Sequence, residues 1–397
     1  MAAKKRATSP PKAAATPKKV VKAPPKSISR KPASAKDRAK AAPSETRTAA
    51  KGAPVKAKRE VSPRSGASNW SVPIGAIRGA SPYAVREVGN VVWILAHTAL
   101  VAADRENPAR RAEIFPCEEG GARTFTRAHA VGDGRFYAVV EGDDGQEVWA
   151  VDPDGTCAWA ATLPEDAWGP ELLASGGRLL VQRGAGIVAL DARSGTRLWA
   201  STLAGPDARA CAALASEGLL VVVADDVERL VLLDSATGEV RSTTPCPDAW
   251  QIADAGGGKV LLGGDGGLHL VDIAREGPPL WTDPRATPPF ALDGRGHVLV
   301  HRDVRKESAR QHRATLSAID LRTGASVWET RVDLFPRMPI VVGDRVFLQG
   351  NRELVALSLV DGALTPECPA HAALGGGRDR LYAWTGPVGH AAVTTIS

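Results

Sequence analysis

The side chains that most often do chemistry are scattered through this 397-residue chain rather than grouped by spacing. Its five cysteines stand at positions 117, 157, 211, 246 and 368, and no pair has the CxxC or CxxCH spacing of a zinc, thioredoxin-type or haem-attachment site. The eight histidines form no HxH or HExxH pattern, and GxSxG and P-loop motifs are absent. We therefore expect structural cysteines, no catalytic residue, no metal site and no cofactor.

Acidic residues gather at three points, residues 143–145, 152–155 and 225–226, where calcium ligands could be sought. All three fall at expected turns between strands, so we interpret them as solvated turn carboxylates. His297 and His301 are four residues apart on one expected strand. We interpret this pair too as structural rather than metal-binding.

One basic segment departs from the rest of the globular part. Residues 301–313 carry five basic and two acidic residues and lengthen the connection between the second and third strands of one repeat. Long loops on a rigid scaffold often carry function, so the segment is a candidate contact site, and an extended polar hairpin is the alternative. The candidate contact residues are Arg302, Arg305, Lys306, Arg310 and Arg313.

Residues 1–68 form a basic tail with 19 Lys or Arg and three acidic residues, whereas the remainder has 31 basic and 41 acidic residues. The tail has no aromatic residue and few aliphatic ones, so it cannot offset its chain entropy and is expected to be disordered. Such a tail binds nucleic acid or another polyanion by counterion release. A spacer, or an arm docked on the acidic body, is the alternative. The residues assigned to polyanion binding are Lys4, Lys5, Arg6, Lys12, Lys18, Lys19, Lys22, Lys26, Arg30 and Lys31.

The globular part, residues 69–397, repeats with a period near 40 residues. In each good copy an aspartate ends an apolar strand, a glycine follows in the turn, and a tryptophan stands on the next strand. The aspartate can accept bonds from turn N–H groups, the glycine supplies a positive φ, and the tryptophan buries its ring between neighbouring repeats. The repeat residues are Asp152, Trp159, Asp191, Gly195, Trp199, Trp281, Asp320, Gly324 and Trp328.

Four short strands at this period predict an all-β, eight-bladed β-propeller, with seven blades as the alternative, behind a disordered N-terminal tail. The last repeat lacks an outer strand. We expect residues 69–75 to supply that strand and close the ring, with Trp70 in the place of the repeat tryptophans. No run of about 20 apolar residues is present, so no membrane span is expected.

The Ala-Leu-Asp-x-x-[Ser/Thr]-Gly-x-x-x-Trp pattern resembles the PQQ-like repeat of quinoprotein alcohol dehydrogenases and of the assembly factor BamB, over about residues 80–397. In composition, the tail resembles those of linker histones. The dehydrogenase resemblance implies a quinone stacked on a disulfide between adjacent cysteines and a bound calcium ion, but this chain has no adjacent cysteines. The BamB resemblance implies a propeller that serves as a binding platform.

We expect a non-enzymatic, monomeric scaffold whose propeller binds a protein partner and whose tail tethers it to nucleic acid or another polyanion. Because no apolar segment follows the basic N-terminus, we expect a cytoplasmic location. Two alternatives remain. One is a quinone-dependent or other small-ligand oxidoreductase, and the other is an envelope assembly factor of the BamB type with a mis-assigned start codon.

Overall fold

Every regular element that the structure describes is a β-strand, and no helix occurs among these residues. The structure is a computed structural model, and the strands all belong to one unit, Pro54–Ser397. The residues described are 70–73, 82–116, 123–163, 171–183, 186–203, 210–216, 218–224, 229–246, 249–275, 277–306, 312–332, 337–349, 354–365, 372–385 and 392–396.

The strands form four-stranded antiparallel sheets, which we number one to eight along the chain. In sheets one to three, four consecutive strands pair in sequence order. Sheet one contains β2 (Pro82–Val88), β3 (Val91–Ala96), β4 (Leu100–Asp104) and β5 (Arg111–Ile114). Sheet two contains β6 (Thr124–Gly132), β7 (Arg135–Gly142), β8 (Gly145–Val151) and β9 (Cys157–Leu163). Sheet three contains β10 (Glu171–Ser175), β11 (Arg178–Arg183), β12 (Gly186–Asp191) and β13 (Arg197–Thr202).

Sheets four to six follow the same plan. Sheet four contains β14 (Ala210–Ser216), β15 (Leu219–Ala224), β16 (Arg229–Asp234) and β17 (Val240–Pro245). Sheet five contains β18 (Gln251–Gly256), β19 (Lys259–Gly264), β20 (Gly267–Asp272) and β21 (Trp281–Asp283). Sheet six contains β22 (Ala286–Leu292), β23 (His297–Lys306), β24 (His312–Asp320) and β25 (Ser326–Val332).

The last two sheets are less regular. Sheet seven contains β26 (Ile340–Val342), β27 (Arg345–Gln349), β28 (Leu354–Ser358) and the two-residue strand β29 (Leu364–Thr365). Sheet eight contains β30 (Ala372–Gly376), β31 (Leu381–Thr385), β32 (Ala392–Ile396) and β1 (Ser71–Pro73), in the order β1-β32-β31-β30. Its fourth strand thus comes from the opposite end of the described chain. Within β1, Val72 is paired with Val393.

The prediction of an eight-bladed propeller, with seven blades as the alternative, needs correction. Six full blades, sheets one to six, are built from four consecutive strands of at least three residues each. The two other sheets differ, because sheet seven ends in a two-residue strand and sheet eight is not consecutive in sequence. The sequence period did not reveal the two-residue strand of sheet seven, because turn glycines recur in every copy whereas strand length depends on pairing between strands. Terminal repeats of such arrays are commonly atypical.

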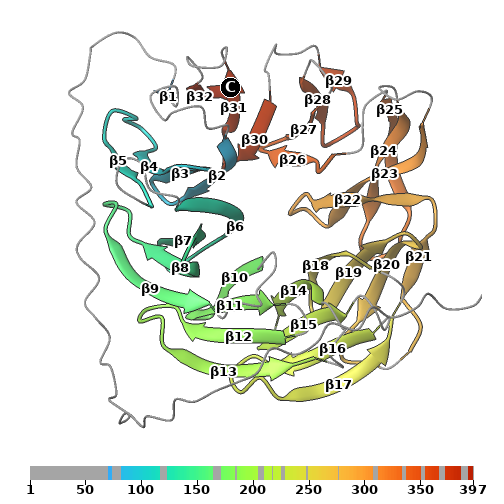
Figure 1. Cartoon of the computed structure of the whole chain (residues 1–397). Helices are drawn as coiled ribbons and strands as arrows, with labels where there is room; N and C mark the ends of the chain where they lie inside the picture. Colours follow the sequence, from blue (N-terminus) through green and yellow to red (C-terminus); the bar gives the residue numbers. More distant parts are fainter. Residues whose placement is uncertain are drawn as a thin grey trace, which may run out of the picture. The chain divides into compact units, whose positions relative to one another are not determined.

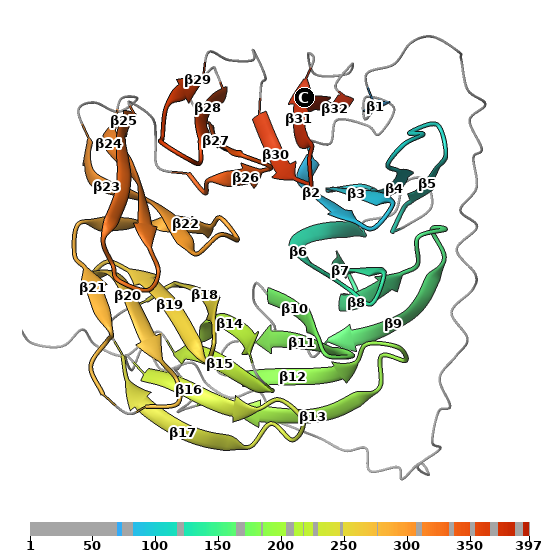
Figure 2. The same cartoon turned by 180° about the vertical axis from the view of Figure 1, so that it is seen from behind.

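The sheets follow one another around a ring, with the first strand of each sheet nearest the centre (Figure 1; seen from behind in Figure 2). The inner strands contact each other in the order β2, β6, β10, β14, β18, β22, β26 and β30, and β30 contacts β2. Apolar residues of each sheet pack against the next sheet. Trp93 of β3, for example, lies with its ring centroid 5.3 Å from that of Phe136 on β7. The core is therefore divided among the sheet interfaces.

Candidate functional site

Five sheet interfaces are joined by a tryptophan on the outermost strand or directly before it. Each indole N–H donates a hydrogen bond to a backbone carbonyl of the following sheet, which satisfies the polar atom of a largely buried ring. The donor–acceptor pairs are Trp159 to Ala192 at 3.1 Å, Trp199 to Ser235 at 3.1 Å, Trp281 to Leu321 at 2.8 Å, Trp328 to Leu359 at 3.0 Å, and Trp70 to Asp104 at 3.0 Å. Trp70 thus makes the same kind of contact at the junction of sheets eight and one.

In four of these interfaces the indole lies directly beneath a turn glycine of the following sheet. A Cβ atom added at Gly195 would lie 2.6 Å from the Trp159 ring, and one added at Gly238 would lie 2.4 Å from the Trp199 ring. Gly324 over Trp281 and Gly362 over Trp328 have the same arrangement. All four glycines have a φ of +71° to +74°. The glycine therefore serves two purposes, since it permits the positive φ and leaves room for the ring.

The aspartate of the repeat holds the turn that carries this glycine. One carboxylate oxygen of Asp191 accepts hydrogen bonds from the backbone N–H groups of Arg193 at 3.1 Å and Ser194 at 2.8 Å. Asp320 accepts in the same way from the N–H and hydroxyl of Thr323. Asp152 differs, because its side chain accepts from Arg135 Nε at 2.8 Å. The aspartates are thus engaged within their own turns or sheets.

Sheet four has no tryptophan at the corresponding position. In sheet three Trp199 pairs with Ala189, and in sheet six Trp328 pairs with Ala318, each directly before a register shift. In sheet four the residue paired directly before the same shift is Ser242, opposite Leu232. Ser242 therefore stands where a repeat tryptophan would stand. The sequence carried this signal, because the fourth copy keeps Asp234 and Gly238 but lacks a tryptophan.

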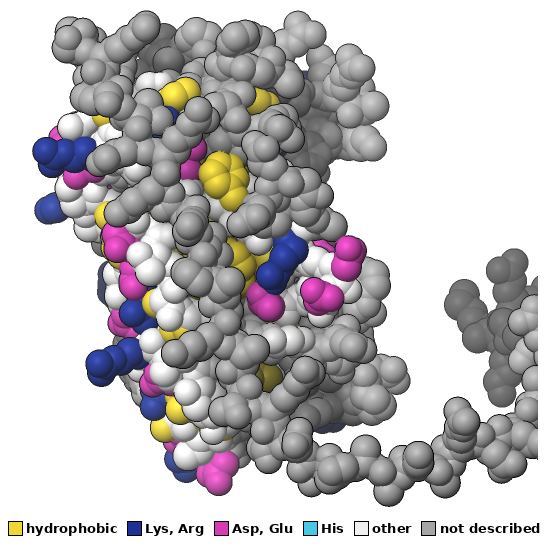
Figure 3. All heavy atoms as spheres, turned by 60° about the vertical axis from the view of Figure 1, so that its left-hand side comes forward, with side chains coloured by type: hydrophobic (Ala, Val, Ile, Leu, Met, Phe, Trp, Pro, Cys, Tyr) yellow, Lys and Arg dark blue, Asp and Glu magenta, His cyan; other side chains and the backbone are white. Residues whose placement is uncertain are grey.

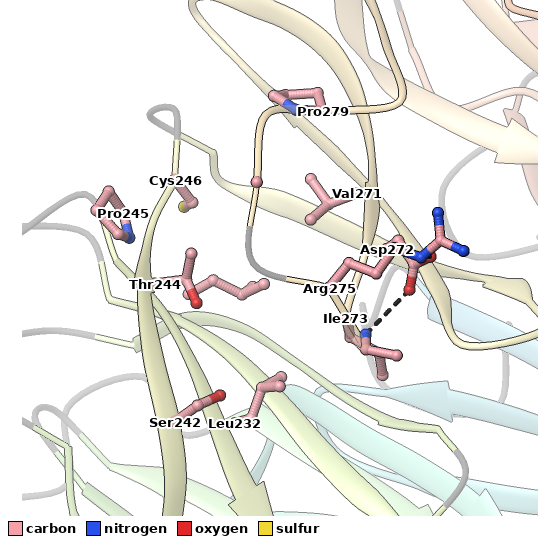
Figure 4. A pocket seen from close by; sticks show the side chains of 13 residues that line it. Leu232, Ser242, Thr244, Pro245, Cys246, Val271, Asp272, Ile273, Arg275 and Pro279 are labelled. Atoms are coloured by element: carbon pink, nitrogen blue, oxygen red, sulfur yellow. Dashed lines mark hydrogen bonds and ion pairs between the residues drawn. The ribbon is translucent and has the colours of Figure 1, made fainter.

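A cavity of about 210 Å³ lies at this position, between the outer half of sheet four and the turn after β20 of sheet five. We call it the notch. Its two walls face each other across the opening (Figure 4), one from β16 and β17 and the other from the end of β20 and the following turn. The lining residues include Leu232, Ser242, Thr244, Cys246, Val271, Ile273 and Gly277.

The notch is not a general result of a missing tryptophan. In sheet one the corresponding residue is Ala112, opposite Ala102, yet a Cβ atom on Gly155 of the following sheet would lie 2.6 Å from the Ala112 side chain. The backbone there has closed over the smaller residue. At Gly277, by contrast, an added Cβ atom would meet no heavy atom within 4 Å. Sheets four and five therefore remain apart where sheets one and two meet.

Polar and apolar groups contribute about equally to the exposed lining of the notch, and the charged residues Asp272 and Arg275 belong to that lining. Arg275 is exposed, with 79% of its side chain accessible, and its Nε lies 3.5 Å from Asp272 Oδ2. Outside the notch lining, at the end of β16, a hydrogen bond from Arg241 and N–H groups of the turn together lower the pKa of Asp234 to about 2. Cys246 is buried and forms no disulfide. A lining that combines apolar side chains with polar groups suits a ligand that has an apolar body and a polar atom.

The basic residues of the predicted contact loop in sheet six lie in different environments in the structure. Arg302 is only 3% exposed, and it is bonded to Asp283 of β21 and Glu329 of β25, each at 2.5 Å. Its assignment to an exposed contact site is therefore corrected, because its charge is matched inside the protein. Arg305 and Arg313 are exposed and lie opposite each other on β23 and β24. Arg310 and the Lys306 side chain lie outside the described part of the chain.

The basic tail residues, Lys4 to Lys31 as assigned above, also lie outside the described residues. The two histidines predicted to be structural, His297 and His301, both lie in the described part of the chain. His301 is fully buried, with Nε2 3.2 Å from the Arg337 carbonyl oxygen, and burial lowers its pKa. His297 Nδ1 lies 2.8 Å from Asp293 Oδ2. Within the described ranges, no group of three or more His, Cys, Asp or Glu side chains is arranged to hold a metal ion.

Charged side chains are mixed in sign on the face shown in Figure 3. The basic and acidic side chains drawn there are interspersed, without a broad field of one sign among them. The notch is thus a more specific local feature than surface charge, and we take it as the candidate functional site.

A family model described as outer membrane protein assembly factor BamB matches residues 58–217 and 183–338. Among curated protein sequences, none is significantly similar to this chain. Solved structures share the fold at low sequence identity. BamB from Moraxella catarrhalis is 16% identical, with a TM-score of 0.55, and the match covers 78% of this chain and 92% of that one.

Two further structures show the range of this fold. The quinohemoprotein alcohol dehydrogenase of Comamonas testosteroni is 14% identical, with a TM-score of 0.57, over 82% of this chain and 75% of that one. The computationally designed Ika8 protein is 14% identical, with a TM-score of 0.58, over 80% of this chain and 97% of that one. The fold is thus shared by an assembly factor, an enzyme and a designed protein, so the fold alone does not define a function.

Proposed function

Since this chain belongs to the family described as outer membrane protein assembly factor BamB, we propose that it is a protein-interaction platform whose binding site is the notch between sheets four and five. The notch is the observation that carries the proposal. It opens beside the outer strand β17 and its lining combines apolar side chains with polar groups, so a side chain of a partner can enter it from solvent. A rigid ring of sheets keeps the two walls at a fixed separation, which favours recognition of one shape.

An oxidoreductase function finds less support in the residues. The quinone and calcium ion of quinoprotein dehydrogenases do not fit this chain, which has no adjacent cysteines and, in its described part, no acidic cluster of metal-binding geometry. Calcium-dependent thermal stabilisation, or quinone absorbance in the purified protein, would support the enzyme alternative.

Photo-crosslinking from the rim of the notch tests the platform proposal. A photoreactive amino acid is placed at the exposed position of Arg275 in the full chain, in cells that produce it. We expect one discrete crosslinked product to a protein partner. The matched control places the same group at Thr162, an exposed residue on the outer strand β9. No discrete product from position 275, or an equal pattern from position 162, would contradict the proposal.

The tail forms the second part of the proposal, because its 19 basic and three acidic residues contrast with an acidic remainder. We propose that the tail tethers the platform to nucleic acid or another polyanion. The test is anisotropy of a short random DNA duplex with the full chain and with residues 69–397, across a salt series. Binding by the full chain alone, falling steeply with salt, is the expected result. Equal binding by the shorter chain would remove the tail from this role.

Cell fractionation of the tagged full chain separates the two settings open to such a platform. We propose the cytoplasm, and an envelope fraction would favour the assembly-factor alternative. No helix of the described residues is long and apolar enough to cross a membrane.

A further inference from the structure

We propose that the notch receives the indole of a tryptophan side chain that a partner polypeptide presents. This inference rests on the proposed platform function and names the group that the platform recognises. Its basis is the comparison of equivalent interfaces within one molecule. Where four other turns each cover an indole of this chain, the turn of sheet five covers an empty space of suitable size.

The position of the space identifies its occupant. In the four other interfaces, the Cβ atom that a turn glycine lacks would lie 2.4–2.8 Å from an indole. In sheet five the turn is one residue longer and its glycine, Gly277, has no positive φ, but this glycine lines the notch and an added Cβ atom would meet nothing within 4 Å. The other side of the space is formed by Ser242, the residue that replaces the tryptophan of sheet four. Ser242 on one side and the turn of sheet five on the other would therefore enclose an indole, and only the indole ring itself is missing.

The volume and lining fit the same group. Apolar cavities of about 150 Å³ are known to take up benzene, so about 210 Å³ accommodates a larger aromatic ring system. Leu230, Leu232, Val271 and Ile273 supply apolar contacts, and they border the buried cluster between sheets four and five. A bound ring would thus extend an existing core rather than rest on an exposed surface.

The polar end of the indole would also find a partner. In the repeat, the acceptor of the indole N–H is the carbonyl of the residue that follows the turn aspartate, as Ala192 follows Asp191 and Ser235 follows Asp234. In sheet five the residue after Asp272 is Ile273, which lines the notch. Arg275 at the rim is exposed and can lie over an aromatic face.

We assign the tryptophan to another polypeptide. Residues 1–68 contain no Phe, Trp or Tyr, so the tail of this chain cannot supply it. The adjoining outer strand, β17, carries Ser242 at the tryptophan position. A second copy of this chain is the other polypeptide source, through a residue such as Trp250, which is 43% exposed. We assign the notch to a different partner protein, and the oligomeric state of the chain tests this assignment against self-association.

A peptide taken from this chain provides the probe. Residues Arg197–Thr202 form β13, whose Trp199 already occupies the equivalent site on sheet four. We expect a fluorescein-labelled peptide of this sequence to bind the full chain, and a peptide with alanine for the tryptophan to bind at least about tenfold more weakly, because the buried aromatic ring supplies most of the contact.

Filling the notch should abolish binding. Ser242→Trp places an indole in the space, and we expect at least a tenfold loss of peptide affinity together with a higher melting temperature. Should that variant fold poorly, Gly277→Leu narrows the notch from the opposite wall, where no positive φ opposes a side chain. Thr162→Trp is the matched control, because it adds a tryptophan at an exposed outer-strand position away from the notch, and it should bind the peptide like the unmodified chain.

Several outcomes would overturn the inference. Equal binding of the two peptides, or unchanged binding to Ser242→Trp, would show that the notch does not read the ring. Binding of free indole without binding of the peptide would assign the site to a small molecule. A dimer of the unmodified chain that dissociates in Ser242→Trp would assign it to a second copy. If crosslinking from position 275 succeeds while the peptide fails, the platform proposal stands and only this inference falls.

Discussion

Trp159 and Gly195 show how one residue pair joins two neighbouring sheets. The ring of Trp159 donates to the Ala192 carbonyl at 3.1 Å and lies under Gly195, whose φ is +73°. Any side chain at residue 195 would therefore be unfavourable for two reasons: the positive φ would strain the backbone, and the Cβ atom would clash with the Trp159 ring. The turn that contains Gly195 therefore also determines how closely sheets two and three pack.

We expect Gly195→Ala to destabilise the protein by about 2 kcal/mol more than Gly177→Ala, since only the first variant adds overpacking to backbone strain. Gly177 is the matched control, because its φ is also +73° but an added Cβ atom would meet nothing within 4 Å. Urea denaturation followed by tryptophan fluorescence measures the difference. Equal destabilisation of the two variants would contradict the role of Gly195 as a seat for the ring.

Asp234 provides a pH-dependent prediction. The hydrogen bond from Arg241 is the largest cause that lowers its pKa, to about 2, and turn N–H groups add to it. The pKa of an unfolded aspartate is about 3.9. Because the folded pKa is depressed, the stability that this carboxylate contributes is present above about pH 4 and is lost as the pH falls towards 2.

Carbon-13 NMR of the side-chain carboxyl groups should show Asp234 titrating near pH 2. Arg241→Leu should raise the pKa of Asp234, since it removes the largest cause of the shift. The pKa of Asp191 should stay unchanged in that variant, because it is lowered by the hydroxyl and N–H of Ser194 instead. An unaltered Asp234 titration in Arg241→Leu would refute the pairing.

Among the elements, β21, β23 and β25 are held together by a buried arginine. Arg302 on β23 bonds to Asp283 on β21 and to Glu329 on β25, so it ties sheet five to sheet six. Asp283 is only 6% exposed. Removal of the guanidinium would leave the buried Asp283 carboxylate with only a backbone N–H donor and the more distant, half-exposed Arg285, whose Nε lies 3.8 Å away, and this costs more than the loss of an exposed ion pair.

We expect Arg302→Met to lower the free energy of unfolding by about 3–5 kcal/mol. Arg295→Met is the control, because Arg295 pairs with Asp344 where both side chains are well exposed, and its loss should cost less than about 1 kcal/mol. Thermal melting of the three proteins compares them. Similar melting temperatures for the two variants would mean that the buried ion pair stabilises the protein no more than the surface ion pair does.

At the scale of the whole molecule, the ring is closed by segments from the two ends of the globular part. The strand β1 pairs with β32, and Trp70 beside it bonds to Asp104 of sheet one at 3.0 Å. Glu87 of sheet one accepts from Tyr382 of sheet eight at 2.5 Å and pairs with Arg105 at 2.9 Å. Because the ring is closed, each inner strand contacts an inner strand on both sides, and every sheet packs between two neighbouring sheets.

Loss of the closing tryptophan should loosen the ring at one junction. We expect Trp70→Ala to cost about 3–5 kcal/mol, because its ring is 6% exposed and packs between sheets eight and one. Amide hydrogen exchange should rise in β32 and β1 and remain low in sheet three. Trp250→Ala, at a 43% exposed tryptophan, is the control and should change neither quantity. Uniform exchange across all sheets would indicate that closure is not local.

The amino-acid sequence by itself determined the all-β class, the PQQ-like repeat and the turn residues, because a 40-residue period and the Asp, Gly and Trp spacing are local properties of the chain. The family match and the structural neighbours confirm that resemblance. The short last strand of sheet seven was not predictable, since strand length depends on pairing partners distant in sequence. The burial of Arg302 was likewise missed, because its carboxylate partners lie 19 and 27 residues away.

The candidate site required the tertiary structure for a related reason. The sequence shows that the fourth copy lacks a tryptophan, and so does the first, where Ala112 stands. Only the packing of the sheets shows that the backbone closes over Ala112 but leaves about 210 Å³ beside Ser242. Whether a smaller side chain produces a cavity depends on how far the surrounding elements can collapse, and that is a property of the assembled ring rather than of the repeat.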